Sequence, residues 1–301
     1  MATTSPFNHR SSADDVLRDQ NLSGQVIIVT GANTGIGYET ARSLAAAGAS
    51  VIATCRSAEK ASATKQRLLQ AHPESTVETA VMDLGSLASV SDFCTQFPYS
   101  KIDTIICNAG VVAPKYGETT DGFEQTVGVC HIGHFLLVKK LLPKLLSAPA
   151  PRVVMVSSES HRAPSRLNFD ALPYPRDKFS PMKAYGQAKL CNALMAVELQ
   201  RRYADQGLTA CYLHPGTMVT TEIGRDSAIV RFAMWLARPF TKTANQGAAT
   251  SVFCATWDNT SELAGNYFSH CAKAKPSAET ANLDAATRLW DVSEHWVENW
   301  S

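Results

Sequence analysis

The sequence has almost no net charge, no long apolar run and no basic cluster. Its 28 Lys and Arg nearly balance its 27 Asp and Glu, so 28 − 27 leaves a formal charge of +1 over 301 residues. Binding to nucleic-acid phosphates needs a basic excess, so we predict no nucleic-acid partner. No segment reaches the about 18 uninterrupted apolar residues of a membrane-spanning helix. Residues 1–15 are too polar for a signal peptide, and we therefore expect a cytoplasmic protein.

Patterns typical of metal sites and disulfide frameworks are also missing. The eight cysteines include no CxxC pair and no Cys/His group with metal-ligand spacing, so we predict no metal site and expect reduced, buried thiols. His131, His134 and His161 have no third ligand at a suitable spacing, and we interpret them as core or supporting residues. What the chain does have is 45% hydrophobic residues, enough for one substantial core.

After a polar N-terminal arm of residues 1–22, apolar runs alternate with helical segments. Six runs predict buried strands, at 26–29, 50–54, 76–81, 103–107, 152–156 and 209–213. Helices are predicted at 38–47, 58–71, 86–96, 123–146, 182–203 and near 280–299. Such alternation requires parallel crossovers. The sequence therefore predicts one α/β domain over residues 23–301, a Rossmann-type doubly wound parallel sheet of about seven strands with helices on both faces.

A glycine-rich segment joins the first expected strand to the first helix. It reads Thr30-Gly31-Ala32-Asn33-Thr34-Gly35-Ile36-Gly37. In a βαβ unit, such glycines let the backbone turn tightly and approach a pyrophosphate, whose charge the helix N-terminus stabilises. We interpret the segment as a dinucleotide site, the alternative being a tight turn without a ligand.

The end of the second expected strand carries Arg56, where NAD-binding proteins place an acidic residue. An Asp or Glu at this point binds the ribose 2′-hydroxyl of NAD, whereas the next acid in this chain is Glu59. A guanidinium is a bidentate, charge-assisted partner for the 2′-phosphate of NADP. The sequence therefore favours NADP(H), the alternative being that Arg56 is a solvated surface charge.

Six motifs in this order resemble the short-chain dehydrogenase/reductase family over nearly the whole chain. They are the TGxxxGIG segment at 30–37, Asp83-Leu84, Asn108-Ala109-Gly110, Ser157-Ser158, the YxxxK pair Tyr185 and Lys189, and Pro215-Gly216. Four further segments, at 156–162, 188–192, 236–242 and 246–250, resemble the WW domain-containing oxidoreductase and retinol dehydrogenase branch of the family. The resemblance implies that NADP(H) is bound by Gly31, Asn33, Thr34, Gly35, Ile36, Gly37, Arg56, Asp83, Leu84, Asn108, Ala109, Gly110, Tyr185, Lys189, Pro215, Gly216 and Thr220.

The YxxxK pair is expected to carry the chemistry. Tyr185 and Lys189 are four residues apart on a predicted helix, so their side chains share a face. A free phenol is a poor proton donor and acceptor near neutrality, and a neighbouring ammonium favours its phenolate form. The resemblance implies that Tyr185 is the acid/base, that Lys189 also binds the nicotinamide ribose, and that Ser158 rather than Ser157 holds the substrate oxygen.

One position departs from the family pattern. The family's N-H-x-G-H-F reads Cys130-His131-Ile132-Gly133-His134-Phe135 here, and the missing Asn is the one that organises a proton relay from the lysine. Cysteine lacks the donor and acceptor pair of a carboxamide. Two hypotheses remain open: the relay is impaired or rerouted, or Cys130 is a small buried residue that the site tolerates.

The substrate and the partners are the least determined. An apolar segment near 225–243 follows the Pro-Gly turn, where the family has its substrate-covering helices, and it suits a lipophilic carbonyl or alcohol such as a retinoid or steroid. The same segment would also suit packing on the sheet or a second subunit, or peripheral membrane contact. The resemblance implies a homodimer. Two functions remain: an NADP(H)-dependent oxidoreductase, or a catalytically weakened nucleotide-binding regulatory protein.

Overall fold

The computed structural model of the chain describes residues 5–216 and 242–300. Thr220 and residues 225–241 of the expected substrate lid lie outside the described residues.

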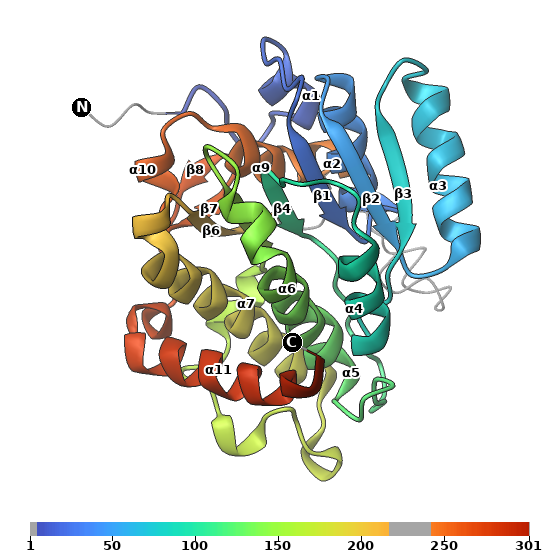
Figure 1. Cartoon of the computed structure of the whole chain (residues 1–301). Coiled ribbons are helices and arrows are strands. Elements are labelled where there is room, and N and C mark those ends of the chain that lie inside the picture. The colour runs from blue at the N-terminus through green and yellow to red at the C-terminus, as the bar shows by residue number, and fades with distance from the viewer. Residues whose placement is uncertain (1–4, 217–241, 301) are drawn as a thin grey trace, which may run out of the picture.

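One sheet of eight strands runs through the molecule in the order β3-β2-β1-β4-β5-β6-β7-β8 (Figure 1). The strands are β1 (Val26–Thr30), β2 (Ser50–Cys55), β3 (Val77–Val81), β4 (Thr104–Cys107), β5 (Arg152–Val156), β6 (Thr209–His214), β7 (Tyr267–Ser269) and β8 (Ala272–Lys273). Every neighbouring pair is parallel except β7 and β8. The predicted doubly wound α/β fold is confirmed. The sequence pattern missed β7 and β8 because three and two residues are too short for a periodic signal.

Helices cover both faces of the sheet. They are α1 (Ala13–Leu17), α2 (Gly35–Ala46), α3 (Ala58–Ala71), α4 (Leu87–Gln96), α5 (Gln125–Val127), α6 (Gly133–Leu146), α7 (Pro181–Tyr203), α9 (Ala244–Thr256), α10 (Thr260–Leu263) and α11 (Leu283–Trp296). Successive residues of β1 point to opposite faces. Ile27 packs in one apolar layer with Leu44 of α2 and Phe253 of α9, and Ile28 packs in the other with Leu136 of α6.

The C-terminal helix adds a third layer on one side. Helix α11 packs across the outer side of α7 (Figure 1), and the ring of Trp290 lies against that of Phe135 with their centroids 4.9 Å apart. Both rings therefore belong to the core, and both side chains are buried. Within the described ranges, no helix combines the length and apolar character needed to cross a membrane.

The single helix predicted at 123–146 is wrong in its first half. The structure has α5, then a π-helical turn over Gly128–Ile132, and only then α6. A π turn accommodates one additional residue and changes the direction of the side chains in it. Gly133 packs against the Leu84 backbone, where a Cβ would lie closer than 3.0 Å to the Leu84 carbonyl oxygen. This tight contact fixes the start of α6 beside the end of β3, which sequence periodicity does not reveal.

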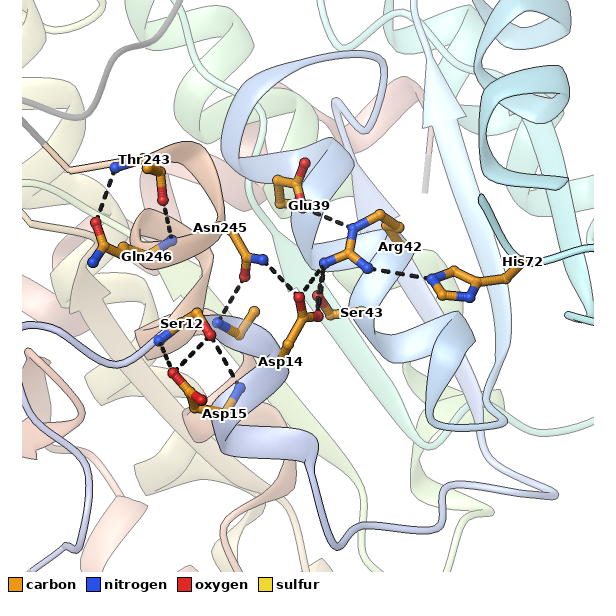
Figure 2. Close-up of polar contacts among 11 residues, drawn as sticks. Ser12, Asp14, Asp15, Glu39, Arg42, Ser43, His72, Thr243, Asn245 and Gln246 are labelled. Carbon is orange, nitrogen blue, oxygen red and sulfur yellow. Dashed lines mark hydrogen bonds and ion pairs between the residues drawn. The ribbon is translucent and has the colours of Figure 1, made fainter. Parts of the chain in front are cut away.

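The N-terminal arm contains α1, which is docked against α2 and α9. Asp14 lies at the centre of the polar contacts shown in Figure 2. Its carboxylate accepts hydrogen bonds from Arg42 at 2.6 Å, from Ser43 Oγ at 2.8 Å and from Asn245 Nδ2 at 2.7 Å. Because Arg42 and Ser43 belong to α2 and Asn245 to α9, one side chain ties three helices together. Ala13, Val16 and Leu17 are buried beneath it.

Replacing Asp14 with Ala is expected to lower the free energy of unfolding by about 1–2 kcal/mol. The effect is smaller than for a buried charged network, because solvent screens the partly exposed carboxylate. Burial raises the pKa of Asp14, but hydrogen bonds from Asn245, Arg42 and Ser43 outweigh it and lower the pKa below 3.8. The stabilisation is therefore present above about pH 4 and is lost as pH falls through the lowered pKa. Urea unfolding at pH 7 and pH 3 measures both effects.

The control is Asp19→Ala on the same segment, since Asp19 is exposed and makes no side-chain hydrogen bond with the described part of the chain. An Asp14→Ala variant that unfolds at the same urea concentration as the unsubstituted protein would show that the contacts of Asp14 in Figure 2 contribute nothing to stability.

Candidate active site

A cavity of about 730 Å³ opens at the carboxyl ends of β1, β4, β5 and β6. The sheet order reverses between β1 and β4, which is where open α/β sheets bind their ligands. Every predicted site residue within the described ranges lines this cavity, from the glycine loop through Arg56, Asp83 and Asn108 to Tyr185 and Pro215-Gly216. Eight segments far apart in the sequence thus converge on one space.

The glycine loop passes very close to its neighbours. Gly31 and Gly35 have φ angles of +65° and +57°, which side chains other than glycine rarely adopt. Gly37 lies in the first turn of α2, and a Cβ there would come closer than 3.0 Å to the Gly31 carbonyl oxygen and to Asn108 Nδ2. These glycines let the loop pack tightly against Asn108 and place the N-terminus of α2 at the cavity wall, as a cradle where a dinucleotide pyrophosphate is stabilised.

Thr30 and Asn108 hold the loop in place from beneath. Thr30 Oγ1 accepts hydrogen bonds from the backbone N–H groups of Asn108 and Ala109, both at 2.9 Å. Asn108 Nδ2 donates to the Thr30 carbonyl oxygen at 2.8 Å. Thr30 Oγ1 also lies 2.8 Å from Nε2 of the buried His134, whose Nδ1 lies 3.0 Å from the Cys130 carbonyl oxygen. The loop is thereby connected to the π-helical turn.

The far end of the cavity is basic. Arg56 is exposed, lines the cavity and forms no ion pair with any residue that the structure describes. Lys60, at the start of α3, lines the same end, and sequence reasoning missed it although it lies four residues after Arg56. Arg67 stacks on Tyr38 at 4.0 Å and donates to the Asn33 carbonyl oxygen at 3.1 Å. Two cations therefore face the cavity and a third supports its wall.

At the opposite end, Lys189 lies beside Tyr185. Lys189 is 3% exposed, and its Nζ donates to the Val156 carbonyl oxygen at 2.8 Å and lies 5.5 Å from the centre of the Tyr185 ring. Ser157 Oγ is occupied, because it donates to the Lys189 carbonyl oxygen at 2.7 Å. Ser158 is half-buried at the cavity wall. Both serines line the cavity; Ser158 is the more exposed of the two, and its Oγ accepts from the Ser160 N–H at 3.2 Å and donates to Ser160 Oγ at 3.3 Å.

The environment of Cys130 differs from what its chemistry alone suggested. Its thiol takes both hydrogen-bonding roles toward one residue: Val111 N–H donates to Sγ at 3.4 Å, and Sγ donates to the Val111 carbonyl oxygen at 3.6 Å. Burial raises the pKa of Cys130, so the thiol stays protonated. The Cys130 carbonyl oxygen accepts from Asn192 at 2.8 Å when the Asn192 amide nitrogen faces it. Cys130 thus holds the backbone that follows Gly110.

The histidines flagged in the sequence are buried and dispersed. His131 Nε2 lies 2.8 Å from Ser293 Oγ of α11, and burial lowers the pKa of His131 to about 3 and that of His134 to about 4. No group of three or more potential ligands that could hold a metal ion occurs within residues 5–216 and 242–300. All eight cysteines are buried and unpaired.

Comparison with known proteins gives a consistent result. A family model described as short chain dehydrogenase matches residues 25–170. The chain is similar to WW domain-containing oxidoreductase of Danio rerio, with 43% identity over 97% of this chain and 73% of the relative. It is also similar to retinol dehydrogenase 11 of Homo sapiens, with 42% identity over 90% of this chain and 85% of the relative.

Solved structures share the fold. An uncharacterized protein from Mycobacterium paratuberculosis has a TM-score of 0.77 at 32% identity, covering 94% of this chain and 97% of that chain. A short chain dehydrogenase from Escherichia coli CFT073, solved in complex with NADPH, has a TM-score of 0.64 at 22% identity, covering 82% of this chain and 96% of that chain. With 43% identity to an oxidoreductase across nearly its whole length, this chain belongs to the short-chain dehydrogenase/reductase family.

Proposed function

We propose that this protein is an NADP(H)-dependent oxidoreductase that interconverts a carbonyl and an alcohol on a lipophilic substrate. The observation that carries the proposal is the convergence of Lys189, Tyr185 and Ser158 on the cavity that the glycine cradle also lines. No single motif makes this argument, because a Tyr-x-x-x-Lys pair by itself is common on helix surfaces.

The cavity fits a dinucleotide. The pyrophosphate would lie at the N-terminus of α2, where Gly31 and Gly37 line the cavity and let the loop pack closely against Ala109 and Asn108. Arg56 and Lys60 would face the 2′-phosphate at one end, and Lys189 would reach the nicotinamide ribose at the other. The charge of the basic end favours NADP(H), since this end would meet the additional phosphate.

Three side chains would handle the substrate oxygen. When bound, the nicotinamide supplies or accepts a hydride. Ser158 would donate a hydrogen bond to the substrate oxygen and hold it, while Tyr185 transfers a proton to or from the same oxygen. The buried ammonium of Lys189 would stabilise the phenolate that remains after the proton leaves. Cys130 keeps the nearby backbone at Val111 in place, so its thiol is compatible with turnover in this arrangement.

The lipophilic substrate class has two supports. The relatives include proteins named retinol dehydrogenase 11 and retinol dehydrogenase 12, and the segment after Pro215-Gly216 is strongly apolar in sequence. The alternative function is a nucleotide-binding regulatory protein with weakened turnover. It predicts that NADPH binds but is not consumed.

The test is NADPH oxidation, followed by absorbance, with retinal, steroid ketones and small aldehydes as substrates. We expect consumption with the lipophilic carbonyls and much less with the small aldehydes. Tight NADPH binding, no consumption with any compound, and no NADP-dependent oxidation of the matching alcohols would favour the regulatory alternative.

Arg56→Asp tests the cofactor preference. Removing one charge-assisted contact to the 2′-phosphate is expected to raise the Kd for NADPH by about tenfold and to leave the Kd for NADH within about threefold, since NADH lacks that phosphate. Nicotinamide fluorescence titration measures both. Lys65→Asp is the matched control. It makes the same change of charge at an exposed residue of α3 that lies outside the cavity. Equal losses for both cofactors would mean that Arg56 is a surface charge.

A further inference from the structure

The peptide group between Ser158 and Glu159 is held on both edges by buried histidines. On one edge, His161 Nδ1 lies 2.6 Å from the Ser158 carbonyl oxygen. On the other edge, the Glu159 N–H donates to His214 Nδ1 at 3.4 Å. These two groups belong to the same peptide unit, and that unit directly follows the serine at the cavity wall.

The contacts of His161 determine where its proton lies. The Ser277 N–H donates to His161 Nε2 at 3.2 Å, so Nε2 carries the lone pair. A carbonyl oxygen only accepts, so Nδ1 carries the proton and donates it to Ser158. His161 is 0% exposed, and its ring lies against Tyr267 with centroids 4.9 Å apart. The ring therefore has one neutral tautomer and one orientation.

His214 requires the opposite tautomer. Its Nδ1 accepts from the Glu159 N–H, so the proton lies on Nε2. The side chain is 7% exposed and lines the cavity, and Nε2 has no hydrogen-bond partner in the described structure. Burial lowers the pKa of His214 to about 4, which keeps the ring neutral at physiological pH.

The neighbouring carboxylate does not serve either ring. Glu159 Oε1 accepts from the Tyr267 hydroxyl at 2.5 Å, and Oε2 pairs with Arg162 at 3.0 Å. Neither histidine is therefore half of a charged His–carboxylate pair. Both act through neutral hydrogen bonds to the backbone. Protonation of His214 would place its Nδ1–H against the Glu159 N–H, and protonation of His161 would place its Nε2–H against the Ser277 N–H.

We propose that His161 and His214 are positioning residues that together fix the Ser158–Glu159 peptide and thereby aim the Ser158 hydroxyl into the cavity. The inference rests on the proposed function, because it gives Ser158 a substrate oxygen to hold. A donor on one edge and an acceptor on the other restrain the peptide plane against rotation, and this plane sets the backbone from which Ser158 Cβ projects. Small displacements of a group that contacts the reacting atoms reduce the rate strongly.

The sharpest test uses the difference between Asn and Gln. In His161→Asn the amide nitrogen replaces Nδ1, so the donor to the Ser158 carbonyl oxygen is kept. In His161→Gln the amide lies at the Nε2 position, so this side-chain donor is lost and only the His161 backbone N–H still donates to the Ser158 carbonyl oxygen, at 3.0 Å. We expect kcat/KM to fall by about tenfold in His161→Gln and to stay within about threefold of the unsubstituted enzyme in His161→Asn, with the Kd for NADPH unchanged in both. At His214, Asn keeps an acceptor for the Glu159 N–H and Gln removes it. We therefore expect the same difference in kcat/KM between His214→Asn and His214→Gln.

Nitrogen-15 NMR of the histidine side chains identifies the tautomer of each ring, and this measurement does not depend on catalytic activity. We expect Nδ1–H at His161 and Nε2–H at His214 in the free protein. If the unsubstituted enzyme turns over carbonyls but the Gln and Asn variants are equally active, the positioning role is wrong and the function stands. If the unsubstituted protein consumes no NADPH, the function fails, and the NMR tautomers alone decide whether the histidines hold the peptide as proposed. Other tautomers would overturn the inference in either case. Thermal unfolding of each variant separates loss of positioning from loss of folding.

Discussion

Tyr185→Phe is expected to lower kcat by about 10²–10⁴-fold, the usual contribution of a positioned acid/base, while NADPH binds with unchanged affinity. The substitution removes one oxygen atom and leaves the ring beside Lys189, whose Nζ lies 5.5 Å from the ring centre. The cofactor contacts at the glycine loop and at Arg56 are untouched. Loss of turnover without loss of binding would therefore isolate the proton-transfer role. Steady-state NADPH oxidation and a fluorescence titration measure the two quantities.

Tyr203→Phe is the matched control, because Tyr203 lies on the same helix, α7, at its far end. It should retain full activity. A Tyr185→Phe enzyme with more than a tenth of the normal kcat would show that another group supplies the proton, and would remove the main support for the proposed mechanism. Lys189→Met should lose activity too, and its NADPH affinity should also fall, because Lys189 is expected to contact the ribose.

Gly37→Ala is expected to have the second largest effect. An added Cβ would come closer than 3.0 Å to both the Gly31 carbonyl oxygen and Asn108 Nδ2, so the loop and the β4 end must move apart. Overpacking of this kind costs about 1–3 kcal/mol, and the same movement distorts the pyrophosphate cradle. We expect the Kd for NADPH to rise by more than about a hundredfold, since anion binding there depends on aligned backbone N–H groups.

Gly207→Ala separates this steric effect from the general cost of replacing glycine. Gly207 has a φ angle of +84° and nothing within 4 Å of an added Cβ, so the variant should lose about 1 kcal/mol from backbone strain and bind NADPH normally. Urea unfolding and fluorescence titration of both variants give the comparison. A Gly37→Ala protein that binds NADPH within threefold of normal would mean that the cradle does not hold the pyrophosphate.

Much of the fold follows from local sequence patterns. The β1 run of apolar, mostly β-branched residues predicts a strand buried on both faces, and the structure has it at Val26–Thr30. The predicted helix at 58–71 matches α3 residue for residue, because its Ser57 cap and its composition are local signals. The glycine loop is recognisable for the same reason, since its glycines and the elements on either side are consecutive in the sequence.

The roles of single residues near the cavity depend on contacts that cross the chain. Ser157 and Ser158 are adjacent and chemically identical, yet only the structure shows that Ser157 donates to the Lys189 carbonyl oxygen. The sequence showed that Cys130 lacks the donor and acceptor pair of a carboxamide. The structure adds that its thiol is hydrogen-bonded to the backbone of Val111. Asp14 belongs to an arm that reads as polar, and its three partners lie on α2 and α9.

The sequence by itself thus determined the doubly wound sheet, the glycine loop and the helical Tyr185–Lys189 spacing, because each depends on periodicity or spacing within one segment. The tertiary structure decided which side chains meet: Asp14 of the docked α1 with its partners on α2 and α9, and the two histidines on one peptide group. Those meetings depend on how separate segments pack, since a hydrogen bond between residues 55 positions apart, as between Glu159 and His214, leaves no periodic trace in the sequence.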